Sequence, residues 1–525
     1  MPLTLMNHPL RVLLLTTAWL LAGCGGGGGG NSNNNTGGGN TGGSNWTPGV
    51  FQPASSFAAR CVNPRSGVDP ATGQPFPDVA GSRTDENNFL RSYSDDTYLW
   101  YDEIIDRDPS LYATPEYFDL LVTNALTPSG TPKDKFHFTY ATDEWFALSQ
   151  SGVSAGYGVQ WVLLSRSPPR DVRAAYTDPN TPATAAGLLR GAEVLEVDGV
   201  DVVSGTDTDT LNAGLFPADV NETHEFLVRD PDGTERRISM TSQSITSAPV
   251  QYVNTISTPT GNVGYMFFND HIRTAEQQLM DAVTQLAADN ITDLVIDMRY
   301  NGGGFLYIAS ELAYMVAGAN QTGGRVFETL TFNDKYPSTN PVTGQALTPT
   351  PFYNTATTGQ SLPSLNLPRV FVLTGPGTCS ASESVMNSLR GINVEVIQIG
   401  STTCGKPYGF YPTDNCGTTY FTIQFRGEND AGFGDYSDGF SPQNASTPAT
   451  TLPGCQVADD FSRALGDPLE ARLAAALEYR NSGTCPAPTA IAVPGVSKSS
   501  GPAFRDEEIV MPRSPLREMR IVDGR

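Results

Sequence analysis

The sequence predicts a multidomain α/β protein with a helical N-terminal segment, a β-rich middle domain and an α/β core of βαβ units. Three observations support this fold class. A chain of 525 residues is too long for one hydrophobic core. Short alternating apolar runs dominate residues 147–246. From Gly261 onward a strand, an amphipathic helix and a second strand follow one another, an order typical of a parallel sheet.

The composition narrows the classes of partner. A formal net charge of −23 argues against nucleic acid, because phosphate binding needs a basic face. Charged residues make up 17% and hydrophobic residues 39%, which suits a globular secreted protein with long loops. The sequence contains no HExxH motif and no paired CxxC spacing, so we expect no metal and no cofactor.

The first 23 residues have the pattern of an export signal. An apolar run, VLLLTTAWLL, follows Arg11 and is too short to span a bilayer stably, which favours a cleaved signal over an anchor helix. Leu21-Ala22-Gly23-Cys24 resembles a bacterial lipobox, which implies cleavage before Cys24 and a lipid on that cysteine. We expect a lipid-anchored protein of the bacterial cell envelope, at the outer membrane and facing the periplasm or the cell surface. Ordinary secretion with an incidental cysteine is the alternative.

Six further cysteines indicate disulfide bonds in an exported chain. They are Cys61, Cys379, Cys404, Cys416, Cys455 and Cys485. Because six cysteines allow about 15 connectivities, the sequence alone does not separate the pairings. We favour Cys404 with Cys416, which would close a short loop. Cys379 is either bonded or a small buried apolar residue.

The elements before the core are a tether, a lead-in and a helical segment. The glycine- and asparagine-rich stretch after Cys24 has no side chains from which to build a core. Phe89, Leu90, Tyr93 and Leu99 recur at roughly helical spacing. The expected boundaries are 1–23 for the signal, 24–85 for the tether and lead-in, 86–146 for the helical segment, 147–246 for the β-rich domain, 247–484 for the α/β core and 485–525 for a linker and a tail whose role the sequence does not indicate.

The β-rich domain has a specific resemblance. GVSAGYGVQWVLL, HEFLVRDPDG and TERRISMTS alternate as short strands split by turns. PATAAGLLRGAEVLEVDGVDV resembles the PDZ family over about 150–246. The resemblance implies that Gly156, Tyr157, Gly158 and Val159 form the loop whose N–H groups hold the carboxylate of a peptide that adds a strand to the sheet. Alternatively, this PDZ-like domain only packs on the core.

In the core, four apolar runs indicate strands: GNVGYMFFND, TDLVIDMRY, RVFVLTG and NVEVIQIG. Helical patterns stand between them, and a closing helix is expected from Asp459. Residues 320–365 lose the pattern and are interpreted as an insertion.

Ser380 and Lys406 are the strongest catalytic candidates. Ser380 lies at a strand-to-helix turn, and Lys406 follows the next strand 26 positions later. A serine hydroxyl needs a neighbouring base, usually histidine, but His137 and His224 lie in no stretch that resembles a catalytic turn. His271 follows a core strand and remains a rival base. A lysine can take this role when it is desolvated, and Lys406 alone of the five lysines lies between two core strands.

An oxyanion needs oriented N–H donors, which helix starts and glycine turns supply. The candidates are the amide of Ala381 and one amide of Gly302–Gly304, among which we favour Gly303.

Three motifs together resemble the C-terminal-processing, or tail-specific, serine peptidases with a Ser/Lys dyad. They are Asp297-Met298-Arg299-Tyr300-Asn301-Gly302-Gly303-Gly304, Ser380-Ala381-Ser382-Glu383 and Gly405-Lys406. The resemblance implies a ClpP/crotonase-like core in which Ser380, rather than Ser382, is the nucleophile and Lys406 the base. It departs at Phe410, where many members carry a glutamine that orients the lysine.

The sequence therefore predicts a lipid-anchored serine endopeptidase that cleaves proteins or peptides recognised through their C-terminal tails. A non-catalytic peptide-binding scaffold and a hydrolase that uses His271 as base are the alternatives. The sequence does not indicate the oligomeric state.

Overall fold

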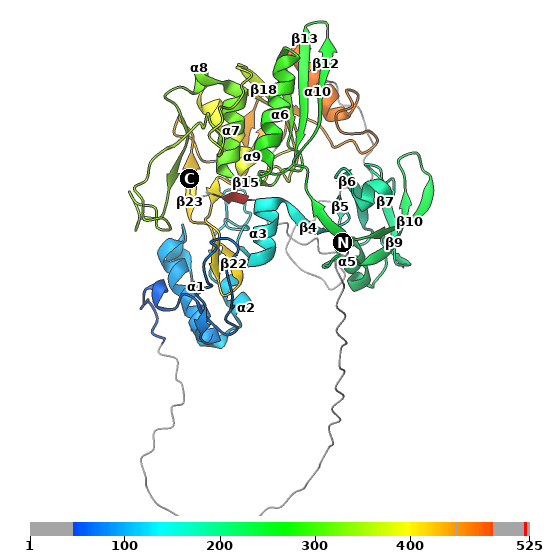
Figure 1. Cartoon of the computed structure of the whole chain (residues 1–525). Coiled ribbons are helices and arrows are strands. Elements are labelled where there is room, and N and C mark those ends of the chain that lie inside the picture. Colours follow the sequence, from blue (N-terminus) through cyan, green and yellow to red (C-terminus); the bar gives the residue numbers. More distant parts are fainter. Residues whose placement is uncertain (1–45, 447–448, 487–518, 522–525) are drawn as a thin grey trace, which may run out of the picture. The chain divides into compact units, whose positions relative to one another are not determined.

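The computed structural model describes residues 46–446, 449–486 and 519–521. Helices and strands alternate along this part of the chain, so the mixed α/β prediction is confirmed (Figure 1). The predicted signal, Cys24 and the tether up to residue 45 lie outside the described residues. Within the described ranges, no helix combines the length and the apolar character needed to cross a bilayer.

A six-stranded sheet forms the centre of the core, in the order β12-β13-β14-β18-β19-β26. Its strands are β12 (Val250–Thr258), β13 (Gly261–Phe268), β14 (Ile291–Asp297), β18 (Arg369–Thr374), β19 (Glu395–Gly400) and β26 (Gly454–Gln456). Only β12 runs antiparallel to its neighbour, and the other adjacent pairs of this sheet are parallel. The βαβ prediction for this region therefore holds.

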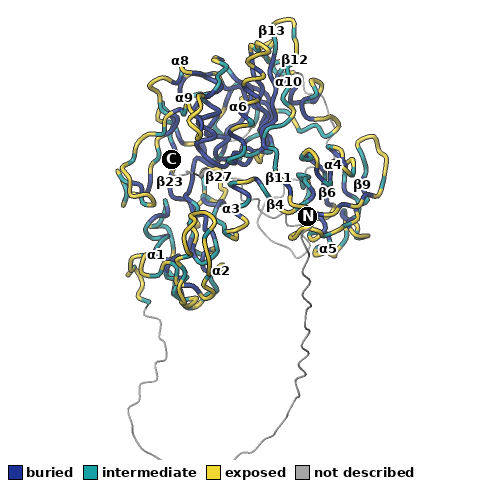
Figure 2. The backbone as a smooth tube through the Cα atoms, in the orientation of Figure 1, coloured by how far each residue is buried: buried dark blue, intermediate teal, exposed yellow. Residues whose placement is uncertain are grey.

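Helices cover both faces of this sheet. The helices are α6 (Ala275–Ala288), α7 (Leu306–Ala317), α9 (Ala381–Gly391) and α10 (Ala471–Ser482). Met266 and Ile296 point into the cluster with α6, α7 and α9, whereas their neighbours Tyr265 and Val295 point into the cluster with α10. This alternation explains why the strands read as nearly continuous apolar runs. In Figure 2 the buried backbone gathers in the core around α6.

The closing helix is shorter than the sequence predicted. It begins at Ala471 rather than near Asp459. The side chain of Glu470 caps it by accepting the Leu473 N–H at 3.0 Å. The carboxylates of Asp459 and Glu470 also bind Arg299 in the core, at 2.6 and 2.7 Å. These long-range contacts hold the chain from Asp459 to Glu470 outside the helix.

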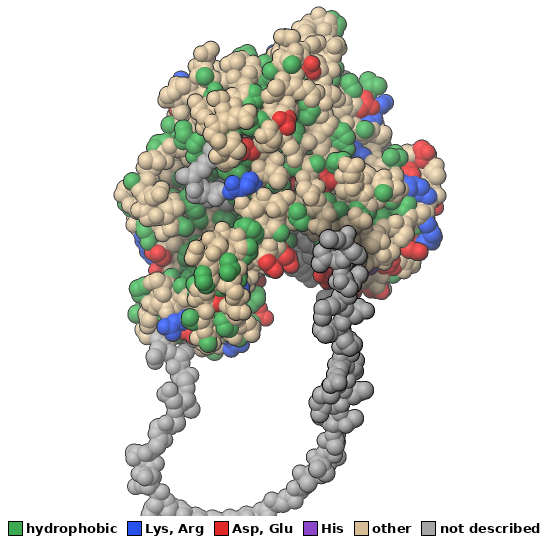
Figure 3. Space-filling view, in the orientation of Figure 1, with side chains coloured by type: hydrophobic (Ala, Val, Ile, Leu, Met, Phe, Trp, Pro, Cys, Tyr) green, Lys and Arg blue, Asp and Glu red, His purple; other side chains and the backbone are tan. Residues whose placement is uncertain are grey.

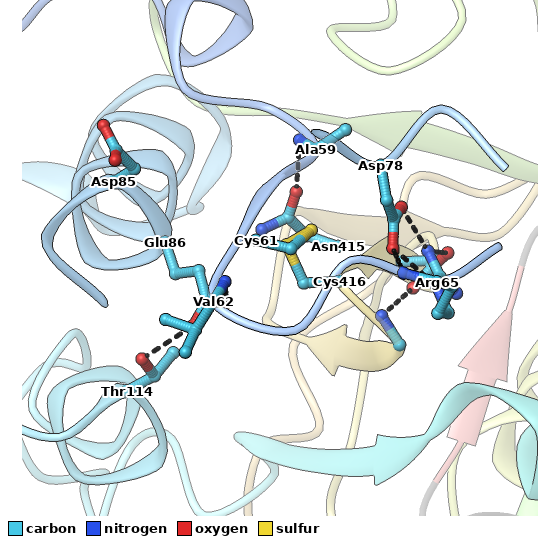
Figure 4. The surroundings of a disulfide bond; sticks show 12 residues. Ala59, Cys61, Val62, Arg65, Asp78, Asp85, Glu86, Thr114, Asn415 and Cys416 are labelled. Carbon is cyan, nitrogen blue, oxygen red and sulfur yellow. Dashed lines mark hydrogen bonds and ion pairs between the residues drawn. A yellow bond between two sulfur atoms is a disulfide. The ribbon is translucent and has the colours of Figure 1, made fainter. Parts of the chain in front are cut away.

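A disulfide bond joins the lead-in before residue 86 to the loop between β21 and β22 (Figure 4). This segment contains η1 (Ala54–Ser56), β1 (Arg60–Cys61) and β2 (Val79–Ala80). Cys61 is bonded to Cys416, 355 positions later in the sequence. The Arg65 side chain bridges the carboxylates of Asp78 and Asp414, each at 2.8 Å. The lead-in is thus held to the core region by the bond at Cys61.

The helical segment includes a strand that the sequence did not reveal. Its elements are α1 (Arg83–Thr97), η2 (Tyr101–Glu103), η3 (Pro109–Leu111), α2 (Thr114–Asp119), β3 (Phe138–Ala141) and α3 (Thr142–Ser151). The first helix begins at Ser82, whose hydroxyl accepts the Asp85 N–H, and it ends before Leu99. Phe89 and Leu90 are buried in a small core as expected. β3 joins β21 (Thr413–Asn415) and β22 (Thr418–Phe421) in the order β21-β22-β3.

The β-rich region begins with β4, after α3 has ended at Ser151. Its elements are β4 (Val153–Gly156), β5 (Val159–Ser165), β6 (Asp171–Thr177), α4 (Pro182–Ala185), β7 (Glu193–Val197), β8 (Val200–Asp201), α5 (Thr208–Leu215), β9 (Thr223–Arg229), β10 (Glu235–Thr241) and β11 (Gln243–Thr246). The main sheet has the order β10-β9-β7-β6-β5, β8 pairs with β7, and β4 pairs with β11. Trp161, Val194 and Phe226 belong to its own buried cluster. In this sheet β5 is an edge strand.

The predicted insertion is partly structured. It contains α8 (Ala319–Thr322), β16 (Val326–Thr331) and β17 (Thr350–Pro351). β16 and β17 join β20 (Tyr408–Gly409) and β23 (Phe425–Glu428) in a sheet of order β17-β16-β23-β20. Two further pairs are β24 (Phe440–Pro442) with β25 (Thr450–Leu452) and β15 (Gly303–Phe305) with β27 (Met519–Ile521).

Charges are dispersed over the molecular face drawn in Figure 3. Lys and Arg side chains stand among Asp and Glu side chains there and form no continuous basic patch. This face therefore lacks the electrostatic footprint of a nucleic-acid-binding surface.

Candidate active site

The serine turn lies between β18 and α9, at the carboxyl edge of the parallel strands. Ser380 is fully buried and precedes the first residue of α9. Its backbone has φ 59° and ψ −114°, a conformation that L-residues rarely adopt and that persists only where surrounding contacts impose it. Its Oγ atom is buried and has no hydrogen-bond partner among the described residues. The hydroxyl therefore lies in the protein interior, directly before the first residue of α9.

Glu383 joins the serine turn to the lysine loop. Its Oε2 accepts the backbone N–H groups of Ser380 and Lys406 at 3.0 and 2.8 Å. Its Oε1 accepts the Gly405 N–H at 2.9 Å and the Thr403 hydroxyl. Burial raises the pKa of this carboxyl above its usual range, although the four hydrogen bonds oppose the shift. One fully buried side chain thus fixes both candidate residues through their backbones.

Lys406 lies in the loop between β19 and β20 and is fully buried. Its Nζ atom is 4.7 Å from the ring centre of Phe136 and 4.3 Å from that of Phe410. Phe410, which stands where many family members carry a glutamine, therefore contacts the amine directly through its ring face. Two aromatic rings therefore line the buried amine.

Gly405 allows the lysine loop to approach its neighbours closely. Its φ of 82° lies in the left-handed region, and a Cβ placed on it would come within 2.3 Å of the Ser437 carbonyl oxygen. Only glycine meets both requirements without rearrangement. The glycine before Lys406 is therefore needed for the position of the loop.

A disulfide bond between Cys379 and Cys404 is a second link between the two turns. Cys379 directly precedes Ser380, and Cys404 N–H donates to the Thr378 carbonyl at 3.0 Å. The predicted Cys404–Cys416 pair is wrong, because Cys416 turns toward the lead-in and bonds Cys61. The third bond joins Cys455 to Cys485, so all six cysteines of the described residues are paired.

The glycine turn packs directly against the serine turn through Asn301. The Asn301 carbonyl accepts the Cys379 N–H and the Ser382 hydroxyl, both at 3.1 Å. Its side-chain Oδ1 accepts the Gly303 N–H at 2.9 Å, and its Nδ2 donates to the Phe268 carbonyl at 3.0 Å. The Gly303 amide, the predicted oxyanion donor, is thus engaged by Asn301. The Ala381 N–H has no acceptor among the described residues.

His271 lies beside the glycine turn and contacts Asn301, not the serine. Its Nδ1 is 3.0 Å from Asn301 Oδ1, so Nδ1 carries the proton that this oxygen accepts. Burial lowers the pKa of His271 to about 3, despite hydrogen bonds that favour the charged form. Within the described part of the chain, no hydrogen bond joins His271 to Ser380. The ring supports the turn as a neutral group.

Arg299 connects the core motif to the β-rich domain. Its fully buried guanidinium binds Asp297 at 2.8 Å and Asp459 at 2.6 Å. Arg190 of the β-rich domain binds Asp459 at 2.6 Å and the Tyr300 hydroxyl at 2.7 Å. The strand end that carries the glycine turn is therefore tied to the β-rich domain by charge-assisted bonds.

The predicted carboxylate loop leads into the edge strand β5. The Tyr157 hydroxyl donates to the Gly214 carbonyl, and Trp161 Nε1 donates to the Leu215 carbonyl, both at 3.0 Å. Gly158 has φ 72° and leads into Val159, the first residue of β5. The loop therefore begins at Gly156, the last residue of β4, and leads to the edge strand β5 near the C-terminal end of α5.

The sequence did not single out Glu383 or Asn301 as functional. A signal for Glu383 was present, because Ser380-x-x-Glu383 at the start of a helix is the pattern of a capping box. Asn301 carried no comparable signal, since its contacts come from strands far apart in the sequence.

A parallel sheet that brings a serine turn, a glycine turn and a buried lysine to one edge has the parts of a hydrolase active site. Comparison with known proteins gives the family. Residues 262–410 match the model described as peptidase family S41. This stretch contains all three motifs, so the predicted resemblance to the C-terminal-processing peptidases is confirmed at the level of the family for this region.

Two curated relatives are cyanobacterial. A carboxyl-terminal-processing protease of Picosynechococcus sp. is 27% identical over 274 residues, which cover 49% of this chain and 56% of the relative. A carboxyl-terminal-processing protease of Synechocystis sp. is 25% identical over 268 residues, which cover 49% of this chain and 54% of the relative. The chain thus spans little more than half the length of these relatives.

One solved structure supports the fold. The crystal structure of an S41 protease from Bacteroides fragilis matches with a TM-score of 0.57 and 22% identity, covering 78% of this chain and 98% of that chain.

Proposed function

We propose that this protein is a serine endopeptidase that uses Ser380 as nucleophile and Lys406 as base. The contact pattern of Glu383 carries the proposal, because one buried carboxylate accepts the N–H groups of both residues. The proposal also agrees with the peptidase family of residues 262–410.

The reaction begins when Ser380 Oγ attacks a peptide carbonyl carbon and Lys406 Nζ takes the hydroxyl proton. The carbonyl electron pair moves to oxygen, and the Ala381 N–H stabilises the charge. The Gly303 N–H is the second donor, and it must exchange its Asn301 acceptor for the oxyanion. When the C–N bond breaks, Lys406 returns the proton to the leaving amine.

A water molecule then hydrolyses the acyl-enzyme. Lys406 takes one proton from the water as its oxygen attacks the ester carbonyl, and the proton returns to Ser380 Oγ as the ester bond breaks. The enzyme leaves the cycle unchanged.

We further propose that the β-rich domain binds the C-terminal tails of substrates. Its free edge strand β5 and the loop from Gly156 to Val159 support strand addition with carboxylate capture. Peptide substrates that differ only in a free or an amidated C-terminus test this proposal. Amidation is expected to raise KM without changing kcat, and equal KM values would contradict carboxylate capture.

Export and lipid attachment at Cys24 complete the proposal. The three disulfide bonds support an oxidising compartment, where such bonds persist. Replacing Cys24 with alanine should move the protein from the membrane fraction to the soluble fraction of the expressing bacteria.

The dyad is tested with Ser380→Ala and Lys406→Ala, assayed on an unfolded protein and on peptides with apolar C-termini. Each variant should lose cleavage, whereas Ser382→Ala and Lys335→Ala should retain it. Lys335 is a suitable control because it pairs with Asp95 far from the serine turn.

A serine-directed phosphonate gives an independent readout. It should label the wild-type protein and fail to label Ser380→Ala. Cleavage by Ser380→Ala or by Lys406→Ala would refute the dyad, and loss of cleavage in His271→Gln with an intact fold would favour the histidine alternative. A protein that neither cleaves nor reacts would be the binding scaffold.

A further inference from the structure

The strand β15 has two edges, and both are occupied by backbone. On one edge, His271 N–H donates to the Gly303 carbonyl at 3.0 Å and Phe305 N–H donates to the His271 carbonyl at 2.8 Å. On the other edge, β27 pairs in parallel, with Gly303 opposite Met519 and Phe305 opposite Ile521. The first partner belongs to the core, whereas the second comes from the tail to which the sequence assigned no role.

We propose that the segment Met519–Ile521 occupies the position of a substrate strand, so that the tail competes with peptide substrates for the active site. This inference rests on the proposed peptidase function. Extended peptides bind sheet edges through main-chain hydrogen bonds, which do not depend on the peptide's sequence. A segment of the same chain can therefore use the edge that a substrate would use.

The position of β27 supports this assignment. β27 pairs with the glycine turn itself and also contacts β20 and α9. β20 begins at Tyr408, two positions after Lys406, and α9 begins directly after Ser380. Figure 1 shows this short red strand beside β15. The segment therefore contacts the glycine turn and the two elements that directly follow Ser380 and Lys406.

The glycines of β15 allow the core backbone at His271 to come close on one edge of this strand. Gly304 has φ 134°, and a Cβ on it would lie 2.4 Å from the His271 carbonyl oxygen. Glycine within a strand often marks a site where another backbone approaches closely, as the His271 backbone does here.

The tail has enough length to reach this edge. Residues 487–518 separate the last residue of the described core from β27, and 32 residues can span up to about 110 Å when extended. A tethered segment acts at an effective concentration of about millimolar. A free peptide must compete with that concentration before it reaches Ser380.

The effect is expected in KM. If the tail occupies the edge in about nine of ten molecules, the apparent KM rises about tenfold, because only the remaining tenth is competent to bind. The value of kcat stays the same, since a bound substrate has already displaced the tail.

The experiment compares the full chain with a chain that lacks residues 519–525, using one fluorogenic peptide substrate. Deletion should lower the apparent KM about tenfold and leave kcat unchanged. A synthetic peptide, MRIVDGR, should inhibit the deletion variant competitively.

Two full-length variants separate backbone pairing from side-chain contacts. Arg520→Pro with Ile521→Pro removes two N–H donors and should behave like the deletion. Arg520→Ala with Ile521→Ala keeps both donors and should retain the KM of the full chain.

Equal KM values in the full chain and the deletion variant would overturn the proposal, and so would a fall in kcat on deletion, which would show that the tail completes the active fold. Failure of the peptidase function would look different, because no chain would cleave the substrate and the phosphonate would label none of them.

Discussion

Replacing Glu383 with glutamine tests whether this side chain positions the active site. The carboxylate accepts four hydrogen bonds, from the N–H groups of Ser380, Gly405 and Lys406 and from the Thr403 hydroxyl. Glutamine has nearly the same shape but only one acceptor oxygen, so it serves two of the four donors.

The cost follows from how the amide orients. The Thr403 hydroxyl can rotate to accept from the new NH2 group, whereas a backbone N–H cannot. The favoured orientation therefore turns the NH2 group toward Thr403 and Gly405. One buried N–H, that of Gly405, then lacks an acceptor, which costs about 1–3 kcal/mol. Because Gly405 directly precedes Lys406, the amine shifts as well, and a shift of about 1 Å lowers kcat by about 100-fold.

The assay combines urea unfolding with steady-state peptide cleavage. Glu276→Gln is a matched control, since Glu276 is also buried and its carboxylate accepts two hydrogen bonds from Thr357, away from the serine turn. Both variants should lose stability, but only Glu383→Gln should lose kcat, with KM unchanged. If Glu383→Gln loses stability and keeps its kcat, as the control does, the positioning role is refuted.

The remaining predictions concern a histidine, two disulfide bonds and a glycine. Burial holds the pKa of His271 at about 3 in the folded protein, so the unfolded chain binds this proton first as the pH falls. The contribution of His271 to the free energy of unfolding should therefore be fully present above pH ~6.5 and should be lost as the pH falls toward ~3, by up to roughly 5 kcal/mol. His271→Gln should remove this decline from the pH dependence of stability measured by urea unfolding. Serine pairs at Cys379 and Cys404 or at Cys455 and Cys485 open loops of similar length, 25 and 30 residues, so each should cost about 3–4 kcal/mol. Only the serine pair at Cys379 and Cys404 should lower kcat. Equal kcat values in the two double variants would show that the Cys379–Cys404 bond is not needed for catalysis. Gly405→Ala should lower both the unfolding temperature and kcat, because its Cβ would meet the Ser437 carbonyl; a variant with wild-type values in calorimetry and cleavage would contradict this packing argument.

The core strands could be predicted from the sequence because each is buried on two faces. β13, β14, β18 and β19 are continuous apolar runs, and α6 shows the helical stripe that packs on them. The serine turn, the glycine turn and the lysine loop follow from these strands, since the carboxyl ends of parallel strands meet at one edge. Ser380 and Lys406 were therefore accessible candidates.

The cysteine pairing could not be predicted in the same way. A short spacing between Cys404 and Cys416 favours contact only if the chain between them turns back, and here the strands β20 and β21 lie between the two cysteines. The true partners of these cysteines lie 25 and 355 positions away. Such pairings depend on the complete fold rather than on local spacing.

The tail strand and the start of the closing helix escaped prediction for a related reason. Met519–Ile521 is held through its backbone, so the type of side chain carries no signal for the pairing. Asp459 has a helical sequence pattern but lies outside the helix, because its carboxylate binds Arg299, 160 positions earlier. Both features are decided by partners that are distant in sequence.

The bond between Cys61 and Cys416 constrains how the chain is made. At a synthesis rate of about 5–20 residues per second, the 355 positions between these cysteines take roughly 20–70 s to emerge. Late in that interval Cys379 and Cys404 emerge before Cys416, so the Cys61 thiol can meet either of them before its own partner exists. A premature bond to either would hold the lead-in against the serine turn. Correct maturation therefore depends on early pairing of Cys379 with Cys404 or on an isomerase that reverses the wrong bond.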